Sequence, residues 1–253
     1  MKTTKSGYRR PASLTKAPMH YCAGCGHSTA HKLLAEVLDE LEISERTIGV
    51  APVGCAVLAY FYLKCDIAEA AHGRTPAVAT GIKRALPDRI VFSYQGDGDL
   101  AAIGLAETIH AANRGEQITV VFINNTVYGM TGGQMAPTTL VGQVTATSPS
   151  GRESATMGGP LRMCELLNTL DQPYYIERVA LDSHAGVLAT KKALRTAFQA
   201  QVEGRGYSFV EILSACPTYF HRSPLESLKF VGGEMAKQFP VRIFRKEGVA
   251  LHA

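Results

Sequence analysis

Tryptophan, long apolar segments and a strong net charge are all missing from this 253-residue sequence. The longest uninterrupted apolar run, Cys55 to Leu63, is far shorter than the ~20 residues that a transmembrane helix needs. The formal net charge of +4, carried by scattered basic residues, is too small to indicate a nucleic-acid-binding surface. With 46% apolar and 19% charged residues, the composition also excludes a disordered chain. We therefore expect a folded cytoplasmic protein that contacts neither a membrane nor nucleic acid.

Acidic residues are missing from the N-terminal region, where the first one is Glu36. The region lacks the apolar segment of a secretory signal and is interrupted by prolines, so we expect residues 1–17 to form an extended arm that contacts a partner or remains in solvent. A transit peptide is the alternative, because such peptides are also poor in acidic residues. The basic residues of this region are Lys2, Lys5, Arg9, Arg10 and Lys16.

Apolar patterns typical of strands alternate with patterns typical of helices along the chain. Such alternation indicates βαβ units, so we predict an α/β fold: one domain with a parallel sheet and helices on both faces. The region 126–160, rich in Gly, Thr and Pro, shows no periodicity and is expected to be a functional loop. The predicted strands are 47–53, 89–94, 117–123, 174–180 and 207–213, and the predicted helices are 27–42, 76–86, 100–113 and 187–202, with a short capped helix after Ser223.

Two polar loops follow neighbouring predicted strands. Gly96-Asp97-Gly98 follows one strand and Asn124-Asn125 follows the next, and ligands of open α/β sheets bind at this carboxyl edge. A carboxylate beside a phosphate is repelled by about 4 kcal/mol per like-charge pair at ~4 Å and an effective dielectric of ~20, unless a cation lies between them. Mg²⁺ prefers oxygen ligands, which Asp97 and Asn125 supply. Each loop alone is typical of an ordinary turn, but together they predict a metal–diphosphate site.

Several motifs resemble those of one enzyme family. The two loops are similar to the thiamine diphosphate motif, and residues 124–134 narrow the resemblance to β subunits of 2-oxoacid:ferredoxin oxidoreductases of the 2-oxoisovalerate or 2-oxoglutarate type. The resemblance implies a thiamine diphosphate-binding domain with an iron–sulfur site over residues 18–220, preceded by the arm 1–17 and followed by a C-terminal extension, 221–253. The other matching motifs are C-A-G-C-G-H at 22–27, P-V-G-C at 52–55, H-G-R at 72–74 and C-P-T at 216–218.

The resemblance also implies which residues bind the cofactor and its metal. Asp97 and Asn125 would ligate Mg²⁺ through their side chains, and Val127 through its carbonyl. Residues 131–139 would form a loop over the cofactor. No catalytic residue is assigned on this chain, because the family's proton-abstracting glutamate is implied on another subunit. The diphosphate would be lined by Gly98, Asp99, Gly129 and Met130, and the thiamine would be approached by Val53, Gly54, Cys55, Ala56 and His72.

Six cysteines in a chain without secretory features indicate metal or redox chemistry rather than disulfides. From the residues alone, a set of four thiolates suits either a [4Fe–4S] cluster or a zinc ion. We expect His27 and His31 to belong to a helix face, and Cys65 and Cys164 to be packing thiols. The family's first motif usually has proline where this chain has Ala23, a change that leaves both neighbouring thiols in place. The resemblance implies four [4Fe–4S] ligands: Cys22, Cys25, Cys55 and Cys216.

The activity implied by the resemblance is the coenzyme A-dependent oxidative decarboxylation of a 2-oxoacid to acyl-CoA and CO₂, with electrons passed through the cluster to ferredoxin. The chain would be active only with an α subunit, or with α, γ and δ subunits, of the same enzyme. Some 2-oxoglutarate-type members have lysine where Gly132 stands, so its absence favours a branched-chain 2-oxoacid. Two alternatives stay open: a non-redox thiamine diphosphate-dependent decarboxylase subunit, and a zinc-stapled nucleotide-binding module.

Overall fold

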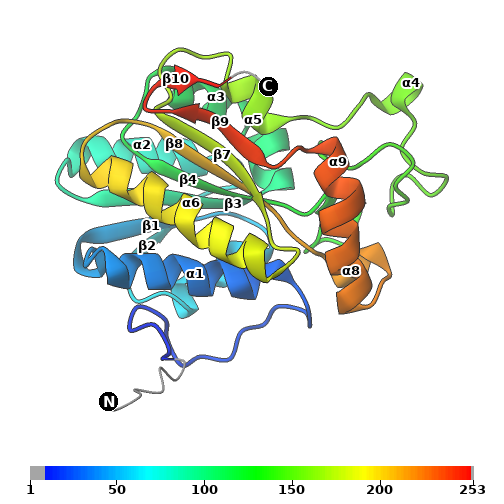
Figure 1. Ribbon diagram of the computed structural model, residues 1–253, viewed down its shortest axis with the longest axis horizontal. Coiled ribbons are helices and arrows are strands. Elements are labelled where there is room, and N and C mark those ends of the chain that lie inside the picture. Colours follow the sequence, from blue (N-terminus) through cyan, green and yellow to red (C-terminus); the bar gives the residue numbers. More distant parts are fainter. Residues whose placement is uncertain (1–8, 252–253) are drawn as a thin grey trace, which may run out of the picture.

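An eight-stranded sheet runs through the middle of the molecule in the computed structural model, which describes residues 9–251 (Figure 1). The strand order is β10-β9-β7-β8-β4-β3-β1-β2, and all neighbours from β7 to β2 are parallel. The parallel strands are β1 (Thr47–Ala51), β2 (Asp66–Glu69), β3 (Ile90–Gly96), β4 (Thr119–Asn124), β7 (Tyr175–Ala180) and β8 (Ser208–Leu213). The antiparallel strands β9 (Arg242–Lys246) and β10 (Val249–Ala250) close one edge.

Helices cover both faces of this sheet, which confirms the predicted fold class. Helices α1 (Gly26–Glu40) and α6 (His184–Val202) lie side by side on one face (Figure 1). Helices α2 (Thr75–Ala85), α3 (Leu105–Asn113) and α5 (Met163–Leu167) cover the other. Because the sheet is enclosed on both sides, every residue of β4 and β8 is buried. Their apolar residues do not alternate with exposed polar ones, and the polar side chains that they contain, such as Glu211, are buried as well.

One predicted helix is divided in two. The segment 100–113 was expected to be a single helix, but it comprises a π-helical turn, η3 (Gly98–Ile103), followed by α3. The break is at Gly104, which passes so close to Gly73 that a Cβ atom on Gly104 would lie 2.5 Å from the Gly73 carbonyl oxygen. Only glycine fits such an approach of two backbones. The turn η3 therefore stands apart from α3 and directly follows the carboxyl end of β3.

The C-terminal residues add a small helical layer and complete the sheet. Helix α8 (Pro224–Phe230) begins with the predicted capping box, in which Ser223 and Glu226 satisfy each other's backbone N–H groups. The chain continues through η4 (Val231–Met235) and α9 (Ala236–Gln238) to β9. Apolar side chains of this segment, including Phe230 and Phe239, pack against Leu213 at the end of β8. Residues 221–251 thus share a core with the sheet.

The described part of the N-terminal arm also packs against the domain. Leu14 is buried and forms an isolated β-bridge with Leu63. Asp39 on α1 accepts hydrogen bonds from the backbone N–H groups of Ala12 and Ser13. Residues 1–8 lie outside the described residues, so the prediction for that part of the arm is not tested.

The remaining elements are short and lie mostly at the carboxyl edge of the sheet. The region 126–160 contains a two-stranded hairpin and a long loop that projects from the body (Figure 1). Within residues 9–251, no helix is both long and apolar enough to cross a membrane. The short remaining elements are η1 (Ser44–Arg46), η2 (Cys55–Phe61), β5 (Val127–Tyr128), β6 (Gln134–Met135), α4 (Ser154–Met157) and α7 (Pro217–Phe220).

Candidate cofactor and metal site

The carboxyl ends of four parallel strands bring the predicted site residues to one edge of the sheet. Residues 52–56 follow β1, Asp97 follows β3, Asn125 follows β4 and Cys216 lies just beyond β8. These strands are consecutive neighbours in the order β8-β4-β3-β1. Their C-terminal loops therefore meet, as expected for ligand sites of open α/β sheets.

A pocket at this edge is lined by all the residues implied to bind thiamine diphosphate and Mg²⁺. Its lining comes mainly from the segments that follow β1, β3 and β4 and from the region of the hairpin β5–β6. The lining also includes His27 and Tyr128, whose side chains were not assigned to the site from the sequence. The lining residues are His27, Pro52, Val53, Gly54, Cys55, Ala56, His72, Gly96, Asp97, Gly98, Asp99, Asn125, Val127, Tyr128, Gly129, Met130 and Thr131.

Asp97 is a buried carboxylate without a cationic partner among the described residues. Its Oδ1 accepts a hydrogen bond from the Gly98 N–H at 2.9 Å, and its Oδ2 accepts one from the Thr138 hydroxyl at 2.6 Å. Burial raises the pKa of Asp97 to about 7, although these hydrogen bonds oppose the increase. A carboxylate held in this way is stabilised by a bound cation, so its chemistry fits Mg²⁺.

The turn after β4 places the other two implied metal ligands. Asn125 is 5% exposed, and its Oδ1 lies 3.4 Å from the Val127 nitrogen, at the long limit of a hydrogen bond. Thr126 between them has φ +61°, a left-handed conformation that is costly for a β-branched residue. Strain of this kind persists only where the surroundings enforce it. Here the Thr126 carbonyl accepts a hydrogen bond from the Thr139 hydroxyl at 2.5 Å.

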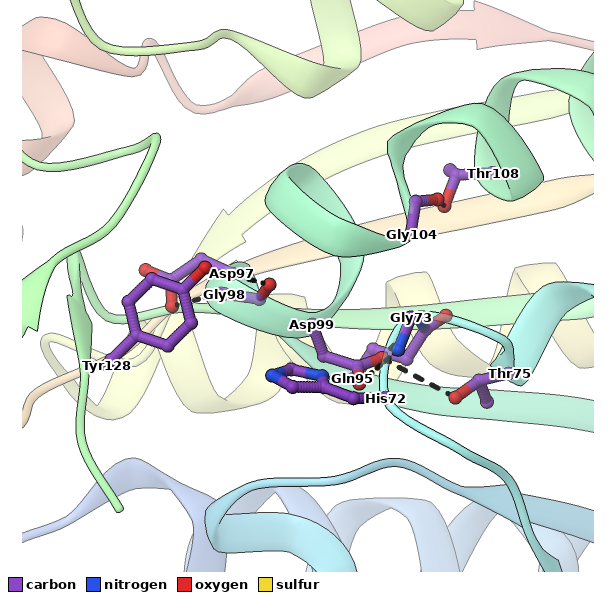
Figure 2. A network of polar contacts seen from close by, with 10 residues as sticks. All are labelled: His72, Gly73, Thr75, Gln95, Asp97, Gly98, Asp99, Gly104, Thr108 and Tyr128. Carbon is purple, nitrogen blue, oxygen red and sulfur yellow. Dashed lines mark hydrogen bonds and ion pairs between the residues drawn. The ribbon is translucent and has the colours of Figure 1, made fainter. Parts of the chain in front are cut away.

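Asp99 is fully engaged by protein donors. It accepts hydrogen bonds from the Gly73 N–H at 2.9 Å and from the Gln95 amide at 2.7 Å, and its Oδ1 lies 2.5 Å from His72 Nδ1 (Figure 2). His72 is 31% exposed and its other ring nitrogen points away from Asp99, on the side of Asp97 and Tyr128 (Figure 2). Asp99 therefore orients the His72 ring at the pocket.

Gly98 is required by the ring that packs against it. A Cβ atom on Gly98 would lie 2.1 Å from a ring carbon of Tyr128. The Tyr128 hydroxyl donates a hydrogen bond to the Gly98 carbonyl at 3.2 Å, and Figure 2 shows the ring beside the Asp97–Gly98 turn. Tyr128 was not predicted as a site residue, although its position next to the implied ligand Val127 indicates one.

The four implied cluster ligands approach one another beside this pocket. Gly129 lies between two of them: a Cβ atom on it would be 3.2 Å from Cys55 Sγ and 3.7 Å from Cys216 Sγ. Burial raises the pKa of Cys25 to about 12, and the neighbouring Cys55 and Cys22 add to the increase. Burial likewise raises the pKa of Cys216 to about 12, with contributions from Cys25 and Cys55. The thiols would therefore release protons on binding a metal.

The arrangement of these thiols is open rather than closed around a metal. In the part of the chain that the structure describes, no group of three or more His, Cys, Asp or Glu side chains could hold a metal ion. The donor set itself still fits a cluster, because all six cysteines are free and four of them converge on Gly129 and the Cys22–Cys25 turn. The other two are elsewhere: Cys65 packs at the α1 side of the sheet and Cys164 is buried on α5.

The rings of Tyr21, His27, His31 and Tyr94 stack on one another, and the first two flank the Cys22–Cys25 turn in the sequence. His27 and His31, on α1 as predicted, are both buried. His27 Nδ1 lies 2.9 Å from the Tyr94 hydroxyl, and His31 Nε2 lies 2.6 Å from the Tyr21 hydroxyl. Burial lowers the pKa of His27 to about 4 and that of His31 to about 3, so both imidazoles are neutral at pH 7. His27 also lines the pocket, a role that its position on a helix face did not reveal.

Comparisons with known proteins match this chain to a thiamine pyrophosphate-binding domain and to subunits of 2-oxoacid oxidoreductases. Residues 54–212 match the family model of the thiamine pyrophosphate enzyme C-terminal TPP binding domain. The chain is 54% identical to a ketoisovalerate oxidoreductase subunit VorA of Methanothermobacter thermautotrophicus over 96% of its own length and 53% of that protein. It is 36% identical to a 2-oxoglutarate synthase subunit KorB of Methanocaldococcus jannaschii, covering 85% of this chain and 78% of that one. The chain thus spans about half the length of its ketoisovalerate relatives.

A solved structure has the same fold. The 2-oxoglutarate:ferredoxin oxidoreductase from Magnetococcus marinus, with 2-oxoglutarate, coenzyme A and succinyl-CoA bound, superposes with a TM-score of 0.75 at 22% identity. The match covers 99% of this chain and 88% of the other. At this level of identity the similarity concerns the fold alone.

Proposed function

Because this chain belongs to the thiamine diphosphate-binding subunits of the 2-oxoacid:ferredoxin oxidoreductases, we propose that it holds thiamine diphosphate, Mg²⁺ and a [4Fe–4S] cluster in such an enzyme. The reaction is the coenzyme A-dependent oxidative decarboxylation of a 2-oxoacid to acyl-CoA and CO₂, with ferredoxin as electron acceptor. Bound thiamine diphosphate supplies the electron sink that this decarboxylation requires. The chain's own residues bind and orient the cofactors.

The observation that carries the proposal is the buried Asp97 carboxylate, which has no cationic partner within residues 9–251 and lies in the same pocket as Asn125. A buried carboxylate without a cation is costly, and a divalent ion bridging it to a diphosphate removes that cost. The backbone of Gly98 lies beside Asp97 in the same pocket. The Tyr128 ring leaves no room for a side chain at Gly98. Asp97, Asn125 and the Val127 carbonyl would hold Mg²⁺, and Gly98, Gly129 and Met130 would lie along the diphosphate.

His72 is proposed to act at the thiamine side of the pocket, with Asp99 as its support. Because a carboxylate only accepts hydrogen bonds, Nδ1 of His72 carries the hydrogen and Nε2 is left to accept one at the pocket. The family resemblance implies that both residues line the cofactor. Because Asp99 is already hydrogen-bonded to protein donors, we propose that it acts on the cofactor indirectly, by orienting His72.

The four cysteines beside the pocket are proposed to bind a [4Fe–4S] cluster. Cys55 supports this assignment best, because it lines the thiamine diphosphate pocket and also lies near Cys216. A [4Fe–4S] cluster held by these thiols would serve as a one-electron carrier beside the cofactor pocket. Zinc at the same four thiols is the competing assignment.

The substrate proposed first is a branched-chain 2-oxoacid such as 2-oxoisovalerate, with 2-oxoglutarate as the alternative. The names of the relatives include both substrates. At the position where some 2-oxoglutarate-type members have lysine, this chain has Gly132 with φ +119°, a conformation that lysine rarely adopts. Because the family resemblance implies the proton-abstracting glutamate on another subunit, we propose that partner subunits supply this glutamate and the rest of the pocket.

Metal analysis of the anaerobically purified chain tests this function. About four iron and four acid-labile sulfide per chain, with visible absorbance that bleaches on dithionite, is the expected result. Calorimetric titration with thiamine diphosphate should give binding with Mg²⁺ and little binding with EDTA. Cofactor binding without iron or zinc would indicate a non-redox decarboxylase subunit. Stoichiometric zinc, without thiamine diphosphate binding, would indicate a zinc-stapled nucleotide-binding module.

A further inference from the structure

Arg152 is a buried cation that has only backbone carbonyls as partners among the described residues. It is 6% exposed, and its guanidinium makes no ion pair there with a carboxylate. The planar guanidinium group has five N–H donors, so it can donate hydrogen bonds to several acceptors at once. The accepting carbonyls belong to Ala136, Pro137, Thr139, Met157, Gly158 and Gly159.

These carbonyls come from two ends of the long loop that follows β6. One set lies in 136–139 and the other in 157–159, so the guanidinium connects two segments that residues 140–156 separate in the sequence. The loop has little regular structure of its own and stands away from the body in Figure 1. Its shape near the sheet therefore depends on Arg152.

The segment that Arg152 holds contains two buried threonines that reach the proposed cation site. The Thr138 hydroxyl donates to Asp97 Oδ2 at 2.6 Å. The Thr139 hydroxyl donates to the carbonyl of Thr126, the strained residue between the proposed ligands Asn125 and Val127. One loop thus touches both of the turns that carry the proposed Mg²⁺ ligands.

We propose that Arg152 is a positioning residue for the cation site, acting through Thr138 and Thr139. With Gly98 N–H on one carboxylate oxygen and Thr138 on the other, the plane of the Asp97 carboxylate is fixed and its remaining lone pairs are left for a cation. The inference rests on the proposed function, since it assumes that Mg²⁺–thiamine diphosphate binds here. Its consequence is reciprocal coupling: an ordered loop favours metal binding, and bound metal orders the loop.

The test uses the full chain and Thr138→Val, which keeps the side-chain volume but removes the hydroxyl. Thiamine diphosphate binding is titrated with Mg²⁺ by calorimetry, and hydrogen exchange of residues 136–159 is followed with and without Mg²⁺–thiamine diphosphate. Because a hydrogen bond to a charged group is strong, we expect Thr138→Val to raise the half-saturating Mg²⁺ concentration about tenfold or more. Thr138→Ser should restore it to within about twofold, which a purely structural loss of packing would not do.

A second pair of variants addresses Arg152 directly. Arg152→Lys keeps the positive charge but loses the planar guanidinium that donates to several carbonyls at once. It should therefore speed amide hydrogen exchange across residues 136–159 and raise the half-saturating Mg²⁺ concentration for thiamine diphosphate binding. Arg162→Lys is the matched control, because Arg162 is exposed just beyond the same loop. Unchanged Mg²⁺ dependence in Thr138→Val, or wild-type exchange that Mg²⁺–thiamine diphosphate does not slow, overturns the inference alone. A wild-type chain that binds no Mg²⁺–thiamine diphosphate overturns it together with the proposed function.

Discussion

Asp99 Oδ1 lies 2.5 Å from His72 Nδ1, and the same carboxylate accepts from the Gly73 N–H directly after that histidine. The two contacts fix both the ring and the backbone that carries it. Asp99 comes from the turn after β3 and His72 from the segment before α2, so the pair joins two elements across the pocket floor. This relationship yields the first prediction.

Asp99→Asn and His72→Gln should each weaken thiamine diphosphate binding by about tenfold, and the double variant by little more than either. The reason is that the carboxylate acts on the cofactor through the ring it orients. Calorimetry at saturating Mg²⁺ measures the three affinities, with melting temperatures recorded alongside. Additive losses in the double variant would show that the two residues act independently.

Asp97→Asn should abolish the Mg²⁺ dependence of thiamine diphosphate binding. The substitution preserves shape but removes the charge that a hard cation requires. The loss should exceed about 100-fold, the upper range for residues that only support a metal ligand. Asp88→Asn, at an exposed carboxylate, is the control. Normal Mg²⁺-dependent binding by Asp97→Asn would remove the metal assignment.

Serine replacement of the cysteines should separate ligands from packing thiols. Each of the four proposed ligands, when changed to serine, should give a chain with less than about one cluster equivalent of iron and sulfide, because serine is a poor substitute for a thiolate. Cys65→Ser and Cys164→Ser should keep full iron and sulfide content. Iron and sulfide assays after anaerobic purification provide the measurement. A full complement in Cys216→Ser would exclude that ligand.

Acid should destabilise the chain through His31. Its folded pKa of about 3 lies below the unfolded value of 6.5, so its contribution is complete above pH 6.5 and is lost as the pH falls towards 3. Between pH 7.5 and 5, this residue alone should lower the free energy of unfolding by about 2 kcal/mol. Urea titrations at both pH values should show a smaller decrease for His31→Phe. The exposed His184→Gln should behave as wild type, and an unchanged decrease in His31→Phe would contradict the prediction.

Much of the fold could be predicted because the inner strands are enclosed on both faces. Strands such as Thr119–Asn124 contain an uninterrupted apolar stretch, here V-V-F-I at 120–123, which leaves a clear signal in the sequence. The outer strands have no such apolar stretch. The strand Asp66–Glu69 lies partly exposed at the edge of the sheet, and Arg242–Lys246 is rich in charged residues. In the latter, Phe244 packs in the apolar core and also makes cation–π contacts with Arg178 and Arg242.

The site was predictable where it follows strands and unpredictable where it depends on tertiary contact. Asp97 and Asn125 come directly after neighbouring strands, so their meeting follows from sheet geometry. Thr138 lies in a loop without periodicity, and its contact with Asp97, 41 residues away in the sequence, is a tertiary contact that no local pattern indicates. His27 has the spacing of an ordinary helix-face residue, and only the position of α1 places it at the pocket.

The position of β8 has a consequence for the order of events during synthesis. This late strand inserts between β4 and β7, so the N-terminal part of the sheet lacks its neighbour until residues 208–213 have emerged from the ribosome. Contacts so distant in sequence form slowly and late. Cys216 lies directly after this strand. A nascent chain that already displays the other three proposed ligands therefore has no complete four-thiol set, and any cluster that needs all four is inserted only after translation has passed this point.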